Sequence, residues 1–156
     1  MIYIGIDMIY IGIDPGKKGA LAYMMERHDG GYITNAVPMD MALVTLRMIS
    51  RLGKPTRCCL EKVHAMPKQG VSSTFTFGTQ YGWIKGQLDA YGVSYQEIPP
   101  EKWKKEFGLN TDKQKSIEVC RKLFPEADLR PSDRCRVDSD GMAEALLMAE
   151  YARRKL

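Results

Sequence analysis

The hydrophobic and polar residues of the chain alternate with two different periods, which together predict an α/β domain. Short runs of apolar and β-branched residues, each bounded by glycine, proline or polar residues, are typical of strands. Five such runs occupy residues 8–14, 19–25, 31–37, 56–63 and 93–98. Helices are expected over residues 40–52, where apolar residues recur three positions apart, and over about 72–91, 101–107, 112–124 and 139–154.

The order of these elements predicts how the sheet is built. The first three strands follow one another directly, and the stretch Asp29-Gly30-Gly31 is a turn signal typical of a hairpin. The last two strands alternate with helices, so they should join the sheet in parallel through right-handed crossovers. We therefore expect an α/β chain with a five-stranded mixed sheet flanked by helices, in the outline of a ribonuclease H-like fold. The helix after residue 70 could be capped by Ser72 or Ser73.

The N-terminus contains a direct repeat, because MIYIGID occurs at residues 1–7 and again at residues 8–14. One strand of fourteen residues would be about 46 Å long, whereas strands usually span about 17–20 Å. Only the second copy continues into PGKKGALA, and a shift by seven residues would turn every side chain to the other face. We expect residues 1–7 to be a duplicated extension outside the core sheet and residues 8–156 to form one domain.

Composition and charge narrow the function classes only moderately. The 156 residues include 23 Lys and Arg and 19 Asp and Glu, and the net charge of +4 permits a nucleic-acid partner. The four cysteines form no C-x-x-C pair, so a reduced, cytoplasmic chain without a zinc site is expected. No apolar run reaches the ~20 residues of a membrane span, so no membrane partner is expected.

Four acidic residues stand at positions that this topology can bring together. Asp14 ends the first strand, Glu61 lies in the apolar run CCLEKV, and Asp140 and Glu144 share one face of the last helix. Sites in open α/β sheets form beyond the carboxyl ends of strands. Clustered carboxylates repel one another unless a cation neutralises them, and Mg²⁺ prefers oxygen ligands. Structural roles would also fit: a turn at Asp14, an ion pair at Glu61, and a helix cap at Asp140 or Asp138.

Three stretches resemble motifs of RuvC-type Holliday junction resolvases. The stretch IGIDPGKKGALA (residues 11–22) is similar to the opening strand of that family, Leu60-Glu61-Lys62 to its second acidic motif, and GMAEALLMA (residues 141–149) to its last helix. The stretches PPEKWKKEFGL and SIEVCRKLFP resemble phage-type members. The last two acids of the family are commonly three residues apart, whereas Gly141 stands three before Glu144. This leaves Asp138 and Asp140 as alternatives, and we favour Asp140.

The resemblance implies a crossover junction endodeoxyribonuclease that resolves four-way (Holliday) DNA junctions. It implies two-metal phosphodiester hydrolysis with Mg²⁺ or Mn²⁺, which leaves 5′-phosphate and 3′-hydroxyl ends. Two metal ions would be bound, and their ligands would be Asp14, Glu61, Asp140 and Glu144. By the same resemblance a lysine lies near the scissile phosphate, and Lys113 and Lys115 are the candidates. No small-molecule cofactor is expected, and two cuts in a two-fold symmetric junction suggest a homodimer.

Basic and aromatic residues indicate where DNA would bind. Between residues 101 and 122, seven basic residues face four acidic ones, which favours contact with a phosphate backbone over a merely solvated helix face. A glycine-bearing loop at residues 64–76 could insert at a branch point, with Phe75 stacking on a base or packing in the core instead. The candidate DNA-binding residues are Lys68, Gln69, Phe75, Lys102, Lys104 and Lys105.

Gly78, Gly82 and Gly86 recur every four residues in the second predicted helix. Each glycine costs ~1 kcal/mol relative to alanine in a helix. A helix face without side chains allows another backbone to approach closely, so we expect this face to pack within the chain or against a second subunit.

Other functions stay open at this point. A nuclease of the same fold could act less selectively on flaps, forks or RNA, or the chain could bind junctions with weak catalysis. A nucleotide-binding domain of the actin or sugar-kinase type also opens with IGID, but it needs a second, similar half for which 156 residues leave no room.

Overall fold

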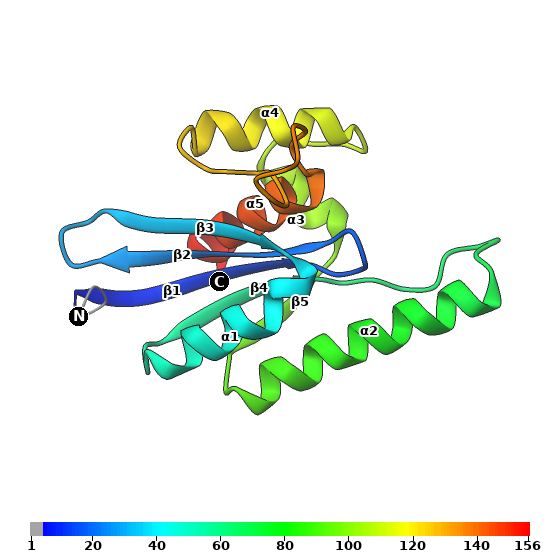
Figure 1. Ribbon diagram of the computed structural model, residues 1–156, viewed down its shortest axis with the longest axis horizontal. Helices are drawn as coiled ribbons and strands as arrows, with labels where there is room; N and C mark the ends of the chain where they lie inside the picture. Colours follow the sequence, from blue (N-terminus) through cyan, green and yellow to red (C-terminus); the bar gives the residue numbers. More distant parts are fainter. Residues whose placement is uncertain (1–4) are drawn as a thin grey trace.

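The five apolar runs form the strands of one mixed sheet in the computed structural model, which describes residues 5–156 (Figure 1). The strands are β1 (Ile6–Asp14), β2 (Ala20–Arg27), β3 (Tyr32–Pro38), β4 (Thr56–Glu61) and β5 (Tyr95–Ile98). The helices are η1 (Met39–Met41), α1 (Ala42–Arg51), α2 (Val71–Ala90), α3 (Pro100–Glu106), α4 (Lys113–Leu123) and α5 (Asp140–Lys155).

The sheet has the order β3-β2-β1-β4-β5. Strands β1, β2 and β3 pair antiparallel, whereas β4 pairs in parallel with both β1 and β5. The predicted five-stranded mixed sheet flanked by helices is therefore confirmed. Within residues 5–156, no helix is both long and apolar enough to cross a membrane.

The central strand β1 is buried on both faces because its side chains alternate between two cores. Ile9, Ile11 and Ile13 pack in a cluster with residues of α1 and α2. Tyr10 packs in the second cluster, which α3, α4 and α5 complete. Figure 1 shows the same division, with α1 and α2 on one side of the sheet and α3, α4 and α5 on the other.

Helix α5 lies directly against β1 and is buried from Gly141 to Ala152. The approach is close enough to require glycine at position 12. A Cβ atom on Gly12 would lie 2.0 Å from the carbonyl oxygen of Ala145 and 2.4 Å from the amide nitrogen of Ala149. The start of α5 is thereby held next to the carboxyl end of β1.

The first copy of the repeat contributes to the sheet, because β1 begins at Ile6. Ile6 pairs with Arg27 and is buried, and the Asp7 carboxylate contacts the His28 imidazole. The prediction that residues 1–7 lie outside the core sheet is wrong for Ile6 and Asp7. The reason is a register irregularity between Ile6 and Met8, which turns Ile6 to the same core as Ile9. The prediction for residues 1–4 falls outside the described residues.

A second expectation fails at the start of α2. This helix begins at Val71 after Gly70, and no side chain caps it, so neither Ser72 nor Ser73 is its N-cap. Two helices at the other face, α4 and α5, do have side-chain caps: Asp112 accepts from Gln114 N–H in α4, and Ser139 accepts from Met142 N–H in α5. All four cysteines are free.

Candidate active site

The strand register brings Asp14 and Glu61 side by side at the carboxyl edge of the sheet. Strands β1 and β4 are parallel, and Ile13 pairs with Leu60, so the next residue of each strand is an acid. Ile13 and Leu60 both face the core under α1 and α2. Because side chains alternate along a strand, Asp14 and Glu61 both face α5.

Helix α5 brings two more acids to the same edge. Asp140 is its first residue, directly after the cap Ser139, and Glu144 lies one turn further on, where it is 8% exposed. The intervening Gly141 packs so tightly that a Cβ atom there would lie 2.4 Å from the carbonyl oxygen of Lys18 and 3.4 Å from Asp14 Oδ2. Position 141 therefore has no room for the acid that the resemblance leads one to expect there, and the acid stands at 140.

The electrostatics of Asp14 and Glu61 indicate that the four carboxylates share one site. Burial raises the pKa of Asp14 well above its ordinary value, and the charges of Glu61, Glu144 and Asp140 raise it further. Burial also raises the pKa of Glu61, while a hydrogen bond from Trp103 acts in the opposite direction. A buried cluster of carboxylates of this kind is stabilised by a cation.

Basic and hydroxyl side chains contact the two acids of α5. Glu144 Oε1 accepts a hydrogen bond of 3.1 Å from the Ser116 hydroxyl and lies 3.7 Å from Lys104 Nζ. Asp140 Oδ2 lies 3.5 Å from Lys113 Nζ. Helix α4 thus supplies a hydroxyl and an ammonium group to the site, and α3 supplies a second ammonium group.

Among residues 5–156, no three acids, histidines or cysteines surround a common point at metal-ligand spacing. The carboxylates are directed to donors instead: Glu61 to Trp103, Glu144 to Ser116 and Asp140 to Lys113. All four offer only oxygen atoms, which suits Mg²⁺ or Mn²⁺.

Asp138 lies apart from this cluster, although the sequence left it as a competitor of Asp140. Its carboxylate accepts hydrogen bonds from the guanidinium of Arg121, with Arg121 Nε 2.9 Å from Asp138 Oδ2. Asp138 therefore joins the loop before α5 to the end of α4. Of the two alternatives, the structure brings Asp140 to the cluster.

The predicted basic residues divide between the site and the surface. Lys113 is at the site, whereas Lys115 is exposed and makes no ion pair within residues 5–156. Lys102 and Lys105 are exposed on α3. Lys104 was predicted only as a DNA-binding residue, but its ammonium group lies near the acid cluster. Helix α3 has only seven residues, so its sequence shows no periodicity that would have placed Lys104 on the side facing the acids.

The loop before α2 carries the other predicted DNA-binding residues. Lys68 is exposed and adopts a positive φ of 65°, and Gln69 accepts a hydrogen bond from the Met66 amide. Phe75 is 76% exposed, so it does not belong to the core. Phe77 instead packs near the turn after β1, where a Cβ atom on Gly16 would lie 3.1 Å from its ring.

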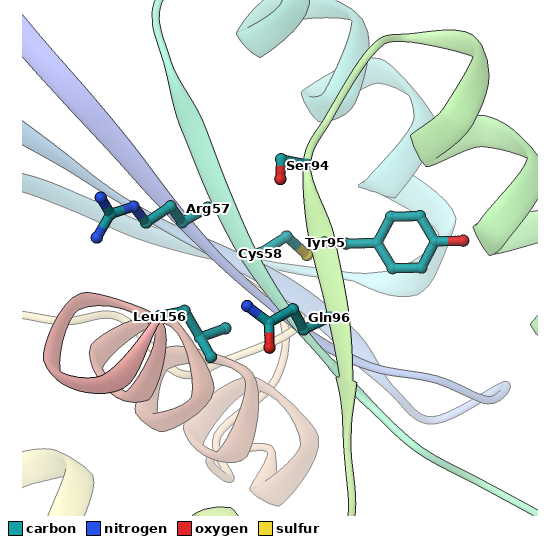
Figure 2. Close-up of a pocket in the computed structure, with 6 residues that line it drawn as sticks. All are labelled: Arg57, Cys58, Ser94, Tyr95, Gln96 and Leu156. Atoms are coloured by element: carbon teal, nitrogen blue, oxygen red, sulfur yellow. The ribbon is translucent and has the colours of Figure 1, made fainter.

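Two hollows lie near β4, β5 and α3. One of about 110 Å³ sits between β4, β5 and the end of α5 (Figure 2) and is lined by Arg57, Cys58, Ser94, Tyr95, Gln96 and Leu156. It lies toward the amino ends of these strands, away from Glu61, and the acids of the site do not line it. A larger hollow of about 500 Å³ lies between α3 and the following loop, beside Lys104.

Two solved structures of RuvC from Thermus thermophilus are similar to this chain along nearly its whole length. RuvC in complex with a Holliday junction substrate superposes with a TM-score of 0.60 and 15% identity, over 95% of this chain and 97% of that chain. The chain has the RuvC fold. A second T. thermophilus RuvC structure superposes with a TM-score of 0.57 and 18% identity, over 94% of this chain and 96% of that chain.

The RuvC fold agrees with the predicted ribonuclease H-like α/β class, which is thereby confirmed. At 15–18% identity the likeness to RuvC establishes the fold alone. No protein-family model and no curated protein matches the sequence. The function therefore has to be argued from the residues of the site.

Proposed function

We propose that the protein is a divalent-metal-dependent endonuclease that resolves four-way (Holliday) DNA junctions. The observation that carries this proposal is the meeting of Asp14, Glu61, Asp140 and Glu144 at one edge of a RuvC-fold sheet. A protein of the same fold has been solved with a Holliday junction substrate. Branched DNA is accordingly the proposed partner.

The four carboxylates would hold Mg²⁺ or Mn²⁺, with two ions per site. Burial and mutual repulsion raise the pKa of Asp14, and a bound cation would offset both effects. A bound divalent ion supplies Lewis-acid stabilisation of the charge on the attacking and leaving oxygens of a phosphodiester. We propose hydrolysis that leaves 5′-phosphate and 3′-hydroxyl ends.

Two lysines would act on the DNA phosphate from the rim of the site. The Lys113 side chain is 76% exposed while its ammonium group lies 3.5 Å from Asp140 Oδ2, so it can reach a phosphate without leaving the site. Lys104 is more enclosed and lies 3.7 Å from Glu144 Oε1. Both can offset negative charge that develops on phosphate oxygens.

Exposed basic and aromatic side chains would supply the contacts with DNA. Lys102 and Lys105 are exposed on α3, and Lys68 and Phe75 are exposed near the start of α2. Lysines would contact the backbone, and Phe75 would stack on an unpaired base near the branch point.

A homodimer is proposed because a junction has two strands to cut. In the described part of the chain, no atom outside the neighbouring helix backbone lies within 4 Å of a Cβ atom built on Gly78, Gly82 or Gly86. Packing among residues 5–156 therefore gives no reason for these glycines, and contact with a second copy would give one.

The test is cleavage of a synthetic four-way junction by the Asp14→Asn variant. We expect junction binding to remain and the Mg²⁺-dependent cleavage rate to fall by more than about 100-fold, since even outer partners of metal ligands are worth 10–100-fold. Asp7→Asn is the matched control, because it changes the same residue of the other repeat copy, and it should cut normally. Cleavage by Asp14→Asn at the wild-type rate would sink the proposal.

The same assay separates the alternatives. Equal cleavage of junctions, flaps, duplexes and RNA by the wild-type protein would indicate a less selective nuclease. Tight junction binding with no cleavage in Mg²⁺ or Mn²⁺ would indicate a junction-binding protein.

A further inference from the structure

The indole of Trp103 contacts the acid cluster from the side of α3. Its side chain is 0% exposed, and its Nε1–H group donates a hydrogen bond of 2.8 Å to Glu61 Oε2. An indole N–H can only donate, so a buried Trp103 needs an acceptor at this place. Glu61 supplies it with one of its two carboxylate oxygens.

The indole is held in place more firmly than the carboxylate that it contacts. Trp103 packs in the core under α5 and meets Phe107 edge to face, with ring centroids 6.5 Å apart. Helix α3 follows β5 directly, and Ile98, the last residue of β5, pairs with Glu61. The short connection from β5 to α3 and the packing of the ring therefore hold the indole next to Glu61.

A glutamate carboxylate, by contrast, turns easily about its last side-chain bond, because that torsion has a broad minimum. A fixed donor on one oxygen removes this freedom. Carboxylates that ligate metals are usually hydrogen-bonded by such outer partners.

We infer that Trp103 is a positioning residue for the metal site: its N–H group holds Glu61 Oε2 and leaves Oε1 for a divalent ion. This inference rests on the proposed function, because it takes Glu61 as a metal ligand. It assigns a purpose to this hydrogen bond beyond satisfying the buried N–H group of Trp103. A phenylalanine would fill much of the same space without the N–H group.

The first test is binding of Mn²⁺ to the Trp103→Phe variant, measured by isothermal titration calorimetry. We expect the Kd for Mn²⁺ to rise by about 10–100-fold, with the variant folded as judged by circular dichroism. Trp83→Phe is the matched control, since Trp83 is 43% exposed on α2, and it should bind Mn²⁺ as the wild type does. An unchanged Kd in a folded Trp103→Phe variant would overturn the inference.

A second measurement keeps the native Trp103. Trp83→Phe leaves a single indole N–H resonance in a ¹⁵N-edited NMR spectrum, because the chain has two tryptophans. Titration with Mg²⁺ should shift this resonance with the same midpoint as calorimetry, and Glu61→Gln should abolish the shift. A resonance that does not move at saturating Mg²⁺ would contradict the positioning role, whether or not Trp103→Phe folds.

The two proposals fail in distinguishable ways. If Asp14→Asn loses Mn²⁺ binding and cleavage but Trp103→Phe retains both, only the role of Trp103 is overturned. If the wild-type protein neither binds Mn²⁺ nor cuts junctions, the proposed function and this inference fall together.

Discussion

Asp14 differs from the other acids of the site in its partners. Glu61, Asp140 and Glu144 each have a donor or an ammonium group nearby, whereas Asp14 accepts no side-chain hydrogen bond within residues 5–156. Its pKa is raised first by burial and then by the three other carboxylates. Without a bound cation, an ionised Asp14 is therefore a cost to folding.

This cost predicts that Asp14→Asn stabilises the protein in metal-free buffer at neutral pH. The folded pKa of Asp14 lies well above 3.8, so the folded state binds the proton more tightly than the unfolded state. The free energy of unfolding consequently falls as pH rises from about 3.8 through the raised pKa. Asparagine removes that dependence while keeping the size of the side chain.

Urea denaturation in EDTA at a series of pH values measures the effect. The stability difference between Asp14→Asn and wild type should be smallest near pH 4 and grow toward neutral pH. Glu61→Gln should change in the same direction, because the pKa of Glu61 is also raised. A difference that stays constant with pH would show that the carboxylate charge is not its cause.

The sequence predicted the acids of the site more completely than their partners. Asp14 and Glu61 end apolar strands, and Asp140 and Glu144 share a helix face, so topology and spacing make all four candidates for one site. Trp103 and Ser116 carry no such signal. Their roles depend on how α3 and α4 pack against α5, which no periodicity along the chain determines.

At the scale of elements, the contact between β1 and α5 holds the site together. It joins Asp14 on the strand to the two acids of the helix, and Gly12 allows it by having no side chain. The duplicated sequence offers a natural comparison, because Gly5 is the same residue in the first copy. Among residues 5–156, the only atom near a Cβ atom built on Gly5 would be His28 Cδ2, at 3.6 Å.

Gly12→Ala should therefore destabilise the protein by about 1–3 kcal/mol or more, because its methyl group collides with the backbone of α5. Displacement of α5 should also lower junction cleavage. Gly5→Ala should change the free energy of unfolding by less than about 0.5 kcal/mol. Urea denaturation measures the free energy of unfolding of both variants. Equal losses of stability in Gly12→Ala and Gly5→Ala would mean that the contact between β1 and α5 is not closely packed at Gly12.

The five strands and the helix positions were predictable because runs of apolar residues mark the strands and the spacing of apolar residues marks the helices. The start of β1 was not. Ile6 can face the core only because of the irregularity between Ile6 and Met8, which shifts the inward and outward alternation of the side chains by one residue. A seven-residue repeat without such an irregularity turns its side chains to the wrong face.

For the whole molecule, α2 stands out because most of its surface has no partner within residues 5–156. Of its twenty residues only Ile84 and Leu88 are buried, and Figure 1 shows its N-terminal end reaching beyond the sheet. Phe75 and Trp83 are exposed on this helix, at 76% and 43%. We propose that a second copy of the chain covers the face that carries Gly78, Gly82 and Gly86.

Gly82→Arg tests this arrangement without weakening the monomer. Within residues 5–156, no atom outside the neighbouring helix backbone lies within 4 Å of a Cβ atom built on Gly82. Arginine favours a helix over glycine by roughly 1 kcal/mol, so the single chain should be at least as stable. In a dimer, an arginine on a glycine face would hold the two helices apart and leave two like charges opposed. We therefore expect sedimentation velocity to report a dimer for the wild type and a monomer for Gly82→Arg.

The control is Val44→Arg, which adds the same charge at a position 55% exposed on α1 and should leave the dimer intact. On a junction, a monomer would cut one strand per encounter, so Gly82→Arg should yield nicked junctions where the wild type yields two resolved duplexes. A Gly82→Arg chain that remains dimeric and makes paired cuts would exclude this face of α2 as the interface. Because the acids of the site lie on β1, β4 and α5, such a result would leave the proposed chemistry of each subunit unaffected.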